Sequence, residues 1–295
     1  MAMQYDHRFL DGKALQARIL KQVQEELARA AADHPLGKLI SISVGPSPEI
    51  DVYVRNQARA ASSVGLPFEQ QMWSADISQD ECKRRIADLN DDPDVLGIIL
   101  QRPVPHHINV RSLQSAIHPL KDVEGMNPAS IGNIVYNDIA LAPCTAAAAV
   151  EMVRQTGLSL RGLEVVIIGH SEIVGKPVAF MLMAEGATVT VCHHMTRSVA
   201  MHSRRADVLV VAVGKPHLIG PDMIKPGAAV IDIGINQITE PDGRVKILGD
   251  VDSDKAKEVA GWITPVPGGV GPVTVAMLIR NALTAHKRQV ASGWM

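Results

Sequence analysis

Two glycines six residues apart, Gly169 and Gly175, stand where an apolar run gives way to a segment with helical spacing. The run, residues 165–168, is Val-Val-Ile-Ile, a composition typical of a buried parallel strand. Ser171 is a candidate N-cap for the helix that follows. Such a turn presents free backbone N–H groups at the positive end of a helix dipole, where phosphate groups bind. The spacing lacks the full G-x-G-x-x-G pattern, so a plain strand-to-helix turn is an equal alternative at this point.

Three later strands in the same half of the chain also end in polar or glycine-rich residues. Strand and helix patterns alternate there, which predicts a doubly wound parallel sheet. Ligands of such sheets bind beyond the carboxyl ends of the strands. The residues expected at those ends are 169–171, 193–196, 213–216 and 234–236. Four such strand ends together favour a dinucleotide site over an empty sheet.

The first half of the chain shows the same alternation, which predicts a small parallel sheet with right-handed crossovers. Helices are expected over residues 10–32, 51–64, 78–90, 145–156, 177–185, 199–204 and 273–287. Strands are expected over 39–44, 68–73, 95–100, 165–168, 188–192, 208–212 and 229–232. Residues 264–272 have the sequence Thr-Pro-Val-Pro-Gly-Gly-Val-Gly-Pro. We expect a stiff, tightly folded loop there, whose backbone can approach a flat ligand closely.

Length and composition limit the class of protein. A chain of 295 residues exceeds one ordinary hydrophobic core, which predicts two domains. The net charge is −2 with no run of like charges, so we expect no nucleic-acid or anionic-membrane partner. Three scattered cysteines indicate a reducing compartment, without a disulfide framework or a metal site. We expect no signal peptide, and no apolar stretch approaches the ~20 residues that span a bilayer, so a cytoplasmic protein is expected.

Several segments together resemble the methylenetetrahydrofolate dehydrogenase/cyclohydrolases of one-carbon metabolism. The resemblance covers nearly the whole chain in order, and the loop over residues 264–272 is highly specific. The other segments that carry it are 11–14, 53–54, 97–101, 118–125, 143–145, 169–177, 212–216, 232–236 and 249–251.

The resemblance implies two α/β domains with a cleft between them. The first is an N-terminal folate-binding domain over residues 1–144 together with the C-terminal helix over 273–295. The second is a Rossmann-type doubly wound domain over residues 145–272 that binds NADP. One implied activity transfers a hydride from 5,10-methylenetetrahydrofolate to the nicotinamide, and the other hydrolyses the resulting 5,10-methenyl cation to 10-formyltetrahydrofolate. A homodimer through the Rossmann domain and a reaction without metal are also implied.

The resemblance also implies the residues of the site. The catalytic residues are Tyr53, Gln57, Gln101 and Glu124. The substrate-binding residues are Tyr53, Gln101, Pro103, Glu124, Pro267, Gly268 and Gly269, and the ring of Tyr53 resembles the one that stacks on the aminobenzoate of folate. The cofactor-binding residues are Gly169, His170, Ser171, Ile173, Val174, His193, His194, Thr196, Val213, Gly214, Ile235 and Thr274.

The chain departs from the family at the lysine credited with proton movement, which is Gln57 here. Tyr53 and Gln57 are four residues apart on one helix face, so position 57 still points into the predicted cleft. A glutamine cannot titrate and cannot act as a general acid or base. We therefore expect the dehydrogenase to be retained and the cyclohydrolase to be lost. The alternatives are a bifunctional enzyme with another group in that role, a binding paralogue without turnover, and a dehydrogenase for another one-carbon carrier.

Three further departures fall in the predicted folate pocket. Ile50 replaces a serine and Arg102 replaces a leucine. Glu124 replaces an aspartate that holds the pterin ring in the family, and it reaches one methylene further. Together these changes indicate a remodelled folate site, with drift in a tolerant loop as an equal alternative.

The predicted cofactor pocket is altered as well. His170 stands where many relatives carry an arginine that grips the 2′-phosphate of NADP, and His193 and His194 follow at the next strand end. Histidines bind phosphate more weakly than arginine and with a dependence on pH. Because no acidic residue ends that strand to bind a ribose hydroxyl, NADP is the expected cofactor, with NAD as the alternative.

Overall fold

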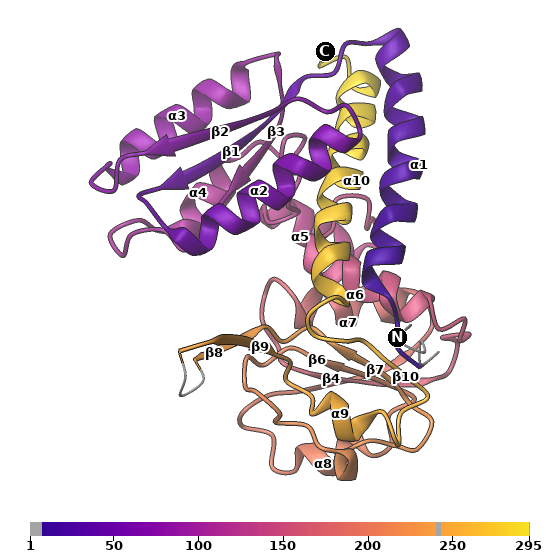
Figure 1. Cartoon of the computed structure of the whole chain (residues 1–295). Coiled ribbons are helices and arrows are strands. Elements are labelled where there is room, and N and C mark those ends of the chain that lie inside the picture. Colours follow the sequence, from indigo (N-terminus) through magenta and orange to yellow (C-terminus); the bar gives the residue numbers. More distant parts are fainter. Residues whose placement is uncertain (1–7, 240–242, 295) are drawn as a thin grey trace. The chain divides into compact units, whose positions relative to one another are not determined.

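The computed structural model describes residues 8–239 and 243–294, which divide into two compact units (Figure 1). One contains Ala17–Cys144 and the chain from Val275 onward, and its sheet has three strands. The other contains the chain up to Gln16 together with Thr145–Thr274, and its main sheet has five strands. We call them the three-strand unit and the five-strand unit. Both are α/β with parallel sheets, as the sequence predicts.

The described residues just before helix α1 (Gly12–Asp33), 8–11, belong with the five-strand unit, whereas the predicted first domain began at residue 1. Phe9 and Ile263 form a parallel β-bridge, and the amide of Leu10 donates to the Ile263 carbonyl at 2.9 Å. The amide of Ile263 donates to the Arg8 carbonyl at 2.7 Å. These backbone bonds extend the five-strand sheet by one more segment, which is why this stretch clusters there.

The three-strand unit alternates helices and strands before a long C-terminal helix completes it. Its elements after α1 are β1 (Lys38–Val44), α2 (Pro48–Ser63), β2 (Phe68–Trp73), α3 (Gln79–Asp91), β3 (Val95–Leu100), α4 (Val110–Ala116), α5 (Pro128–Val135) and α10 (Val270–Ala291). The first residues of α1 and of α10 belong to the five-strand unit. The strand order is β2-β1-β3, so β3 is an edge strand.

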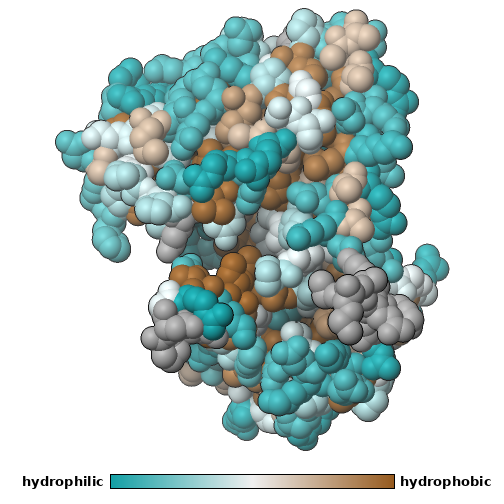
Figure 2. Space-filling model, in the orientation of Figure 1, coloured by the Kyte–Doolittle hydropathy of each residue, from teal (hydrophilic) through white to brown (hydrophobic). Residues whose placement is uncertain are grey.

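Helix α1 is amphipathic, with the predicted spacing of apolar residues. Its buried apolar side chains are Leu15, Ile19, Val23 and Leu27. They recur every four residues and form one stripe, as expected for a helix with one face against a core. The side of α1 turned to the viewer in Figure 2 is mostly hydrophilic. Asp11 caps the helix, because its carboxylate accepts hydrogen bonds from the amides of Lys13 and Ala14.

The five-strand unit is a doubly wound sheet. Its elements are α6 (Cys144–Arg154), β4 (Glu164–Ile168), α7 (Gly175–Ala184), β5 (Thr188–Cys192), α8 (Val199–Ser203), β6 (Val208–Val211), η1 (Pro221–Met223), β7 (Ala229–Asp232), β8 (Asn236–Thr239), β9 (Val245–Leu248), α9 (Ser253–Ala256) and β10 (Trp262–Ile263). The parallel strands have the order β10-β7-β6-β4-β5. Strand β5 lies on one side of β4 and the next strand, β6, lies on the other, so the strand order reverses at β4. Ligands bind at the carboxyl edge of such a reversal.

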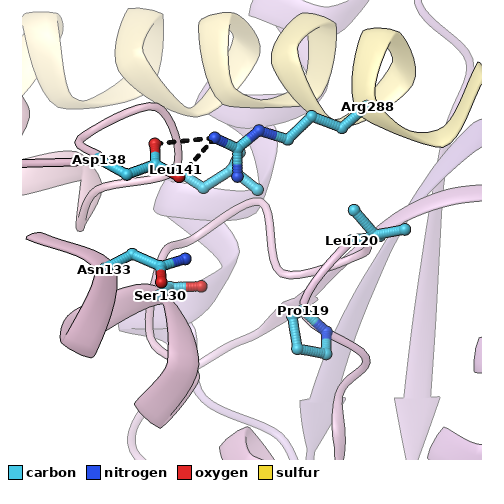
Figure 3. Close-up of a pocket in the computed structure, with 7 residues that line it drawn as sticks. All are labelled: Pro119, Leu120, Ser130, Asn133, Asp138, Leu141 and Arg288. Carbon is cyan, nitrogen blue, oxygen red and sulfur yellow. Dashed lines mark hydrogen bonds and ion pairs between the residues drawn. The ribbon is translucent and has the colours of Figure 1, made fainter. Parts of the chain in front are cut away.

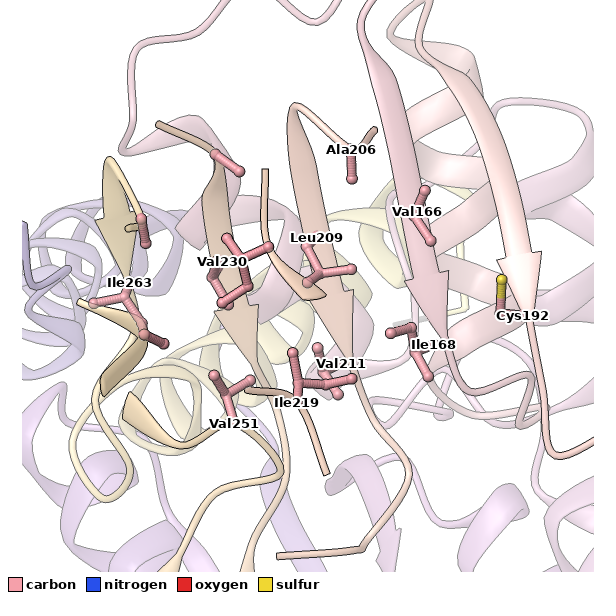
Figure 4. Close-up of a cluster of buried hydrophobic side chains, with 14 residues drawn as sticks. Val166, Ile168, Cys192, Ala206, Leu209, Val211, Ile219, Val230, Val251 and Ile263 are labelled. Carbon is pink, nitrogen blue, oxygen red and sulfur yellow. The ribbon is translucent and has the colours of Figure 1, made fainter. Parts of the chain in front are cut away.

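A buried apolar cluster supports the five strands from one face (Figure 4). Its members on the strands include Val166, Ile168, Leu209, Val211 and Val230, each at most 2% exposed. Alternate residues of neighbouring parallel strands point to the same face, so these side chains pack as one layer. The loops at the strand ends therefore start from a rigid base.

The sequence pattern does not predict α4, α5, β10 or the antiparallel β8–β9 hairpin. These elements are short, from 2 to 8 residues, so hydrophobic periodicity has little length in which to appear. Helix α10 also begins three residues before its predicted start at residue 273, with Gly271 and Pro272 in its first turn. A proline fits there because the first helical amides have no intrahelical partner.

Asn281 of α10 connects that helix to the loops of the three-strand unit. Its buried amide donates to the Val123 carbonyl at 2.9 Å and to the Ala142 carbonyl at 3.0 Å. Both carbonyls belong to the segment between β3 and α6. The C-terminal helix therefore holds this segment in place through one side chain.

We expect Asn281→Leu to lower the free energy of unfolding by about 2 kcal/mol, because two carbonyls lose their buried donor. Urea denaturation followed by circular dichroism measures this. Thr284→Ala is the matched control, since the bond that the Thr284 hydroxyl makes to the described residues is to the Arg280 carbonyl of its own helix. Equal stabilities of the two variants would contradict the role of Asn281.

Candidate active site

The carboxyl end of β3 brings two of the predicted site residues into contact. Gln101 follows the last residue of β3, and its buried side-chain amide donates to the Ser41 hydroxyl at 3.0 Å and to the Gln57 Oε1 at 2.7 Å. Gln57 lies on α2, one turn after Tyr53, whose side chain is about half exposed. The structure therefore places Tyr53, Gln57 and Gln101 at one end of the three-strand sheet.

The Gln57–Gln101 pair offers hydrogen bonds but no titratable group. Gln101 donates through Nε2 to two oxygens at once, so the Gln57 oxygen already accepts one hydrogen bond. Gln57 can offer a ligand its own N–H₂ group and the second lone pair of that oxygen. The pair can orient a substrate or a water molecule, and it cannot accept or release a proton in a reaction.

Glu124 reaches the same strand end from the opposite edge of β3. The amide of Ile98 donates to the Lys121 carbonyl at 2.9 Å, and two residues further the amide of Leu100 donates to the Glu124 Oε2 at 2.9 Å. The segment after Lys121 therefore runs along the outer edge of β3, and the Glu124 carboxylate replaces a carbonyl as the next acceptor. This bond places a half-buried carboxyl group beside Gln101.

Burial dominates the electrostatics at Glu124. Removal from water raises the pKa of Glu124 to about 7, although the charge of Arg102 and the Leu100 amide both favour the carboxylate. The neighbouring Asp122 raises that pKa further. Burial also raises the pKa of the Cys144 thiol, and the charge of Glu124 adds to this effect. A carboxyl group with a pKa near neutrality can both take and release a proton at physiological pH.

The remaining substrate residues implied by the sequence lie on two different loops. Pro103 is exposed and follows a cis peptide bond in the loop after β3. Pro267, Gly268 and Gly269 belong to the five-strand unit, whereas the other predicted substrate residues belong to the three-strand unit. There the amide of Gly12 donates to the Gly268 carbonyl at 3.0 Å.

In the five-strand unit, the turn between β4 and α7 has room only for glycine at its two glycine positions. A Cβ on Gly169 would lie 2.2 Å from the Ala212 carbonyl oxygen, and Gly169 has a φ of +117°. A Cβ on Gly175 would lie 2.0 Å from the Gly169 oxygen. The turn therefore packs against the end of β6, at the reversal of strand order. This backbone cradle at the start of a helix fits a dinucleotide phosphate.

Ser171 caps a turn before α7 rather than the helix itself. Helix α7 begins at Gly175 and its N-cap position is Val174, whereas the sequence predicted Ser171 as the N-cap. The Ser171 hydroxyl accepts hydrogen bonds from the amides of Val174 and Gly175 at 3.2 and 3.4 Å. An extra turn between the cap and the helix explains the difference. Ile173 and Val174 lie in this turn and are half-buried.

Asp250 holds the loop after β6, which contains two predicted cofactor residues. Its carboxylate accepts hydrogen bonds from the amides of Val213, Gly214 and Lys215 at 2.7, 3.0 and 2.8 Å. Asp232, at the end of β7, in turn accepts the amide of Asp250 at 3.1 Å. Sequence reasoning assigned no role to Asp232 or Asp250, although both stand in segments that carry the resemblance. For Asp232 the usable signal is an aspartate at the end of a parallel strand, whereas Asp250 follows the antiparallel strand β9 and offers no such signal.

Three imidazoles gather at the carboxyl ends of β4 and β5. The ring centres of His170 and His193 are 4.8 Å apart, and those of His193 and His194 are 5.8 Å apart. Among the described residues, the ring nitrogens of His170, His193 and His194 lie close enough together to bind one metal ion. The amide of Met195 donates to His193 Nδ1 at 3.1 Å, so neutral His193 carries its proton on Nε2. His193 therefore presents a donor, which suits a phosphate better than a metal.

The other predicted cofactor residues have mixed surroundings. The Thr196 hydroxyl accepts the amide of His193 at 2.9 Å and so shapes the histidine loop. Ile235 is about half exposed after β7. The Thr274 hydroxyl donates to the Val270 carbonyl within α10 at 3.2 Å, so it is engaged in its own helix.

A separate small cavity of about 190 Å³ lies in the three-strand unit (Figure 3). It is lined by Pro119, Leu120, Ser130, Asn133, Asp138, Leu141 and Arg288. Arg288 spans one side of it and donates to both carboxylate oxygens of Asp138, at 2.7 and 2.8 Å. Its one strong cation is thus already paired, and none of the predicted site residues lines it.

The raised pKa of Glu124 predicts a pH-dependent stability. Because the folded state binds the Glu124 proton up to pH of about 7 and the unfolded state only up to its ordinary value near 4.5, the stability from this group falls as pH rises between those values. We expect Glu124→Gln to gain up to about 3 kcal/mol relative to the wild type between pH 4.5 and pH 8. Urea denaturation across this range measures it.

Glu69→Gln is the control with the opposite sign. Lys38 lowers the pKa of Glu69 through a hydrogen bond, so the stability that Glu69 contributes is present at neutral pH and is lost on acidification. If the free energy of unfolding of Glu124→Gln varied with pH in the same way as that of the wild type, the raised pKa of Glu124 would be refuted.

Two family models match the chain. Residues 10–124 match the tetrahydrofolate dehydrogenase/cyclohydrolase catalytic domain, and residues 143–290 match the tetrahydrofolate dehydrogenase/cyclohydrolase NAD(P)-binding domain. A relative from Rhodobacter capsulatus named bifunctional protein FolD is 79% identical over 295 residues, which are 100% of this chain and 98% of the relative.

Solved structures agree with this similarity over both units. A bifunctional FolD methylenetetrahydrofolate dehydrogenase/cyclohydrolase from Campylobacter jejuni is 37% identical with a TM-score of 0.91, covering 95% of this chain and 99% of that one. A Trypanosoma brucei methylenetetrahydrofolate dehydrogenase-cyclohydrolase, solved with NADP and an inhibitor, is 37% identical with a TM-score of 0.90, covering 96% of this chain and 98% of that one. The chain belongs to the tetrahydrofolate dehydrogenase/cyclohydrolase family.

Proposed function

We propose that this chain oxidises 5,10-methylenetetrahydrofolate to 5,10-methenyltetrahydrofolate with NADP and then hydrolyses the product to 10-formyltetrahydrofolate. The match of both domains of one family within a single chain carries the proposal. The names of the relatives support the second activity, since they are called bifunctional. They favour the bifunctional alternative over the loss of the cyclohydrolase that Gln57 led us to expect.

In the oxidation, the cofactor accepts a hydride at its nicotinamide. The contribution of the protein is to bind and orient the two reactants. The cradle at Gly169 and the start of α7 would hold the pyrophosphate. Tyr53 and the Gln57–Gln101 pair would orient the folate through stacking and hydrogen bonds. Hydride transfer needs no proton relay at position 57, so the amide is compatible with this step.

The three histidines support NADP over NAD. They would surround the 2′-phosphate with up to three N–H donors. The Trypanosoma brucei relative was solved with NADP bound.

We expect His170→Arg to raise the preference for NADP, as the ratio of kcat/KM for NADP to that for NAD, about tenfold, because a guanidinium binds phosphate more strongly than an imidazole does. His170→Ala should lower that ratio. The control is His202→Ala, a histidine of α8 outside the cluster. A ratio that does not respond to substitution at position 170 would exclude the cluster as the phosphate site.

A second candidate function is a dehydrogenase without the hydrolase step. The observation that favours it is the amide pair itself, because Gln57 occupies the place of a lysine and bonds to Gln101. The two candidates differ only in the fate of the 5,10-methenyl product.

Two rates on one purified sample separate the candidates. Reduction of NADP with 5,10-methylenetetrahydrofolate measures the dehydrogenase. Decay of 5,10-methenyltetrahydrofolate above the buffer rate measures the cyclohydrolase. We expect both activities in the wild type, and we expect Gln57→Lys to raise the cyclohydrolase about tenfold or more, because an amine can relay protons. A wild-type cyclohydrolase at the buffer rate would select the second candidate.

The homodimer and the cytoplasmic location stay predictions. The edge strand β5 supports a dimer, because its outer edge is unpaired within the described sheet and Val191 on it is 38% exposed. No helix among the described residues is long and apolar enough to cross a membrane.

A further inference from the structure

We propose that Glu124 carries the proton in the hydrolysis of 5,10-methenyltetrahydrofolate, in the role that the lysine absent at position 57 has in the family. The inference rests on the proposed cyclohydrolase activity and deepens it. It would explain how a chain without a titratable side chain at position 57 catalyses the second reaction, for which its relatives are called bifunctional.

The geometry places the carboxyl group and the amide pair at consecutive positions of one strand end. Leu100 donates its amide to Glu124 Oε2 at 2.9 Å, and the next residue, Gln101, holds Gln57 at 2.7 Å. Glu124 is half-buried, so a bound ligand can reach it. No hydrogen bond to its Oε1 occurs within the described part of the chain, which leaves that oxygen available to a water molecule.

The backbone of Glu124 is also held from two sides. Its carbonyl accepts a hydrogen bond from the backbone amide of Cys144 at 3.3 Å. The carbonyl of the preceding residue, Val123, accepts one from the side-chain amide of Asn281. A general base needs such a fixed position, because proton transfer requires hydrogen-bond geometry to the attacking water.

The charged and titratable groups that act on Glu124 come from three segments. Arg102 in the loop after β3 favours its charged form, and Asp122 on its own segment opposes it. Cys144 at the start of α6 interacts with it, and Arg280 of α10 acts on Cys144. Burial outweighs the two groups that favour the carboxylate and raises the pKa of Glu124 to about 7. The group is thus able to change its protonation state during turnover at neutral pH.

The neighbouring residues are poorer proton carriers. Asp122 is 1% exposed, and its carboxylate already accepts hydrogen bonds from the Met126 and Asn127 amides and the Ser130 hydroxyl. Burial raises the pKa of Cys144 well above its ordinary value, so its thiol stays protonated.

The reaction balances with Glu124 as the only shuttle. Water adds to the methenyl carbon through an oxygen lone pair, and the carboxylate takes the proton that the water releases. The substrate cation and the carboxylate become neutral in this step. The bond from that carbon to the folate nitrogen N5 then breaks, its electron pair stays on N5, and the Glu124 carboxyl returns its proton there. The hydroxyl proton leaves to solvent as the formyl C=O forms, so methenyl cation and water give 10-formyltetrahydrofolate and one proton.

The test compares the full-length wild type with Glu124→Gln, Glu124→Asp and the double variant Glu124→Gln/Gln57→Lys. Glutamine keeps an oxygen acceptor for the Leu100 amide and removes the proton exchange, so it separates chemistry from position. Both activities are measured from pH 5.5 to pH 8.5, with kcat and KM resolved for each. Circular dichroism and urea denaturation establish that each variant is folded.

We expect the wild-type cyclohydrolase kcat to rise with pH around a midpoint of about 7. Glu124→Gln should lower that kcat about 100-fold or more and remove the rise, while its effect on the dehydrogenase appears mainly in the KM for folate. Glu124→Asp should keep the pH-dependent rise at a lower kcat. The cyclohydrolase kcat of the double variant should be at least tenfold higher than that of Glu124→Gln, because the added amine replaces the missing proton carrier.

Three outcomes would overturn the inference. A Glu124→Gln kcat within threefold of the wild type would show that the proton goes elsewhere. An equal fall of kcat in both activities, without rescue in the double variant, would leave Glu124 as a residue that only holds the substrate. A wild-type cyclohydrolase at the buffer rate would remove the activity itself, and only this outcome also refutes the second half of the proposed function.

Discussion

The hydrogen bond from the Leu100 amide to the Glu124 carboxylate is the interaction on which the candidate folate site depends. As an edge strand, β3 leaves backbone amides that need acceptors. The Lys121 carbonyl satisfies Ile98, and the Glu124 side chain satisfies the next outward amide. The carboxylate is thereby held at the carboxyl end of the strand, beside Gln101. One bond completes the sheet edge and aims a titratable group at the site.

The five-strand unit uses buried carboxylates in a similar way. Asp250 gathers three successive amides of the loop after β6, and Asp232 accepts the amide of Asp250. Burial raises the pKa of Asp232 to about 6, against the effect of its backbone donors. These carboxylates act as structural acceptors where regular strand bonding ends. The loops that they shape are those expected to contact a dinucleotide at the reversal between β4 and β6.

Each unit has one residue that differs from what the resemblance to the family implies. Gln57 offers an amide where the resemblance implies an ammonium, and His170 offers an imidazole where it implies a guanidinium. An ammonium beside Glu124 would favour the carboxylate and lower its pKa, whereas the amide of Gln57 has no charge with which to offset burial. In the cofactor pocket, imidazole N–H groups would meet a phosphate where the resemblance implies the fork of a guanidinium.

The sequence by itself determined the alternation of helices and strands, the parallel sheets, the glycine turn at 169–175 and the family, because these follow from local periodicity, backbone freedom and motifs. It also placed Gln57 on the face of α2 that meets Gln101. Only the tertiary structure decided that the chain before α1 joins the five-strand sheet, that Ser171 caps a turn and not α7, and that Asp232 and Asp250 brace the cofactor loops. The environment of Glu124 belongs to this second group. Its pKa depends on burial and on contacts between segments far apart in the chain, which no local pattern records.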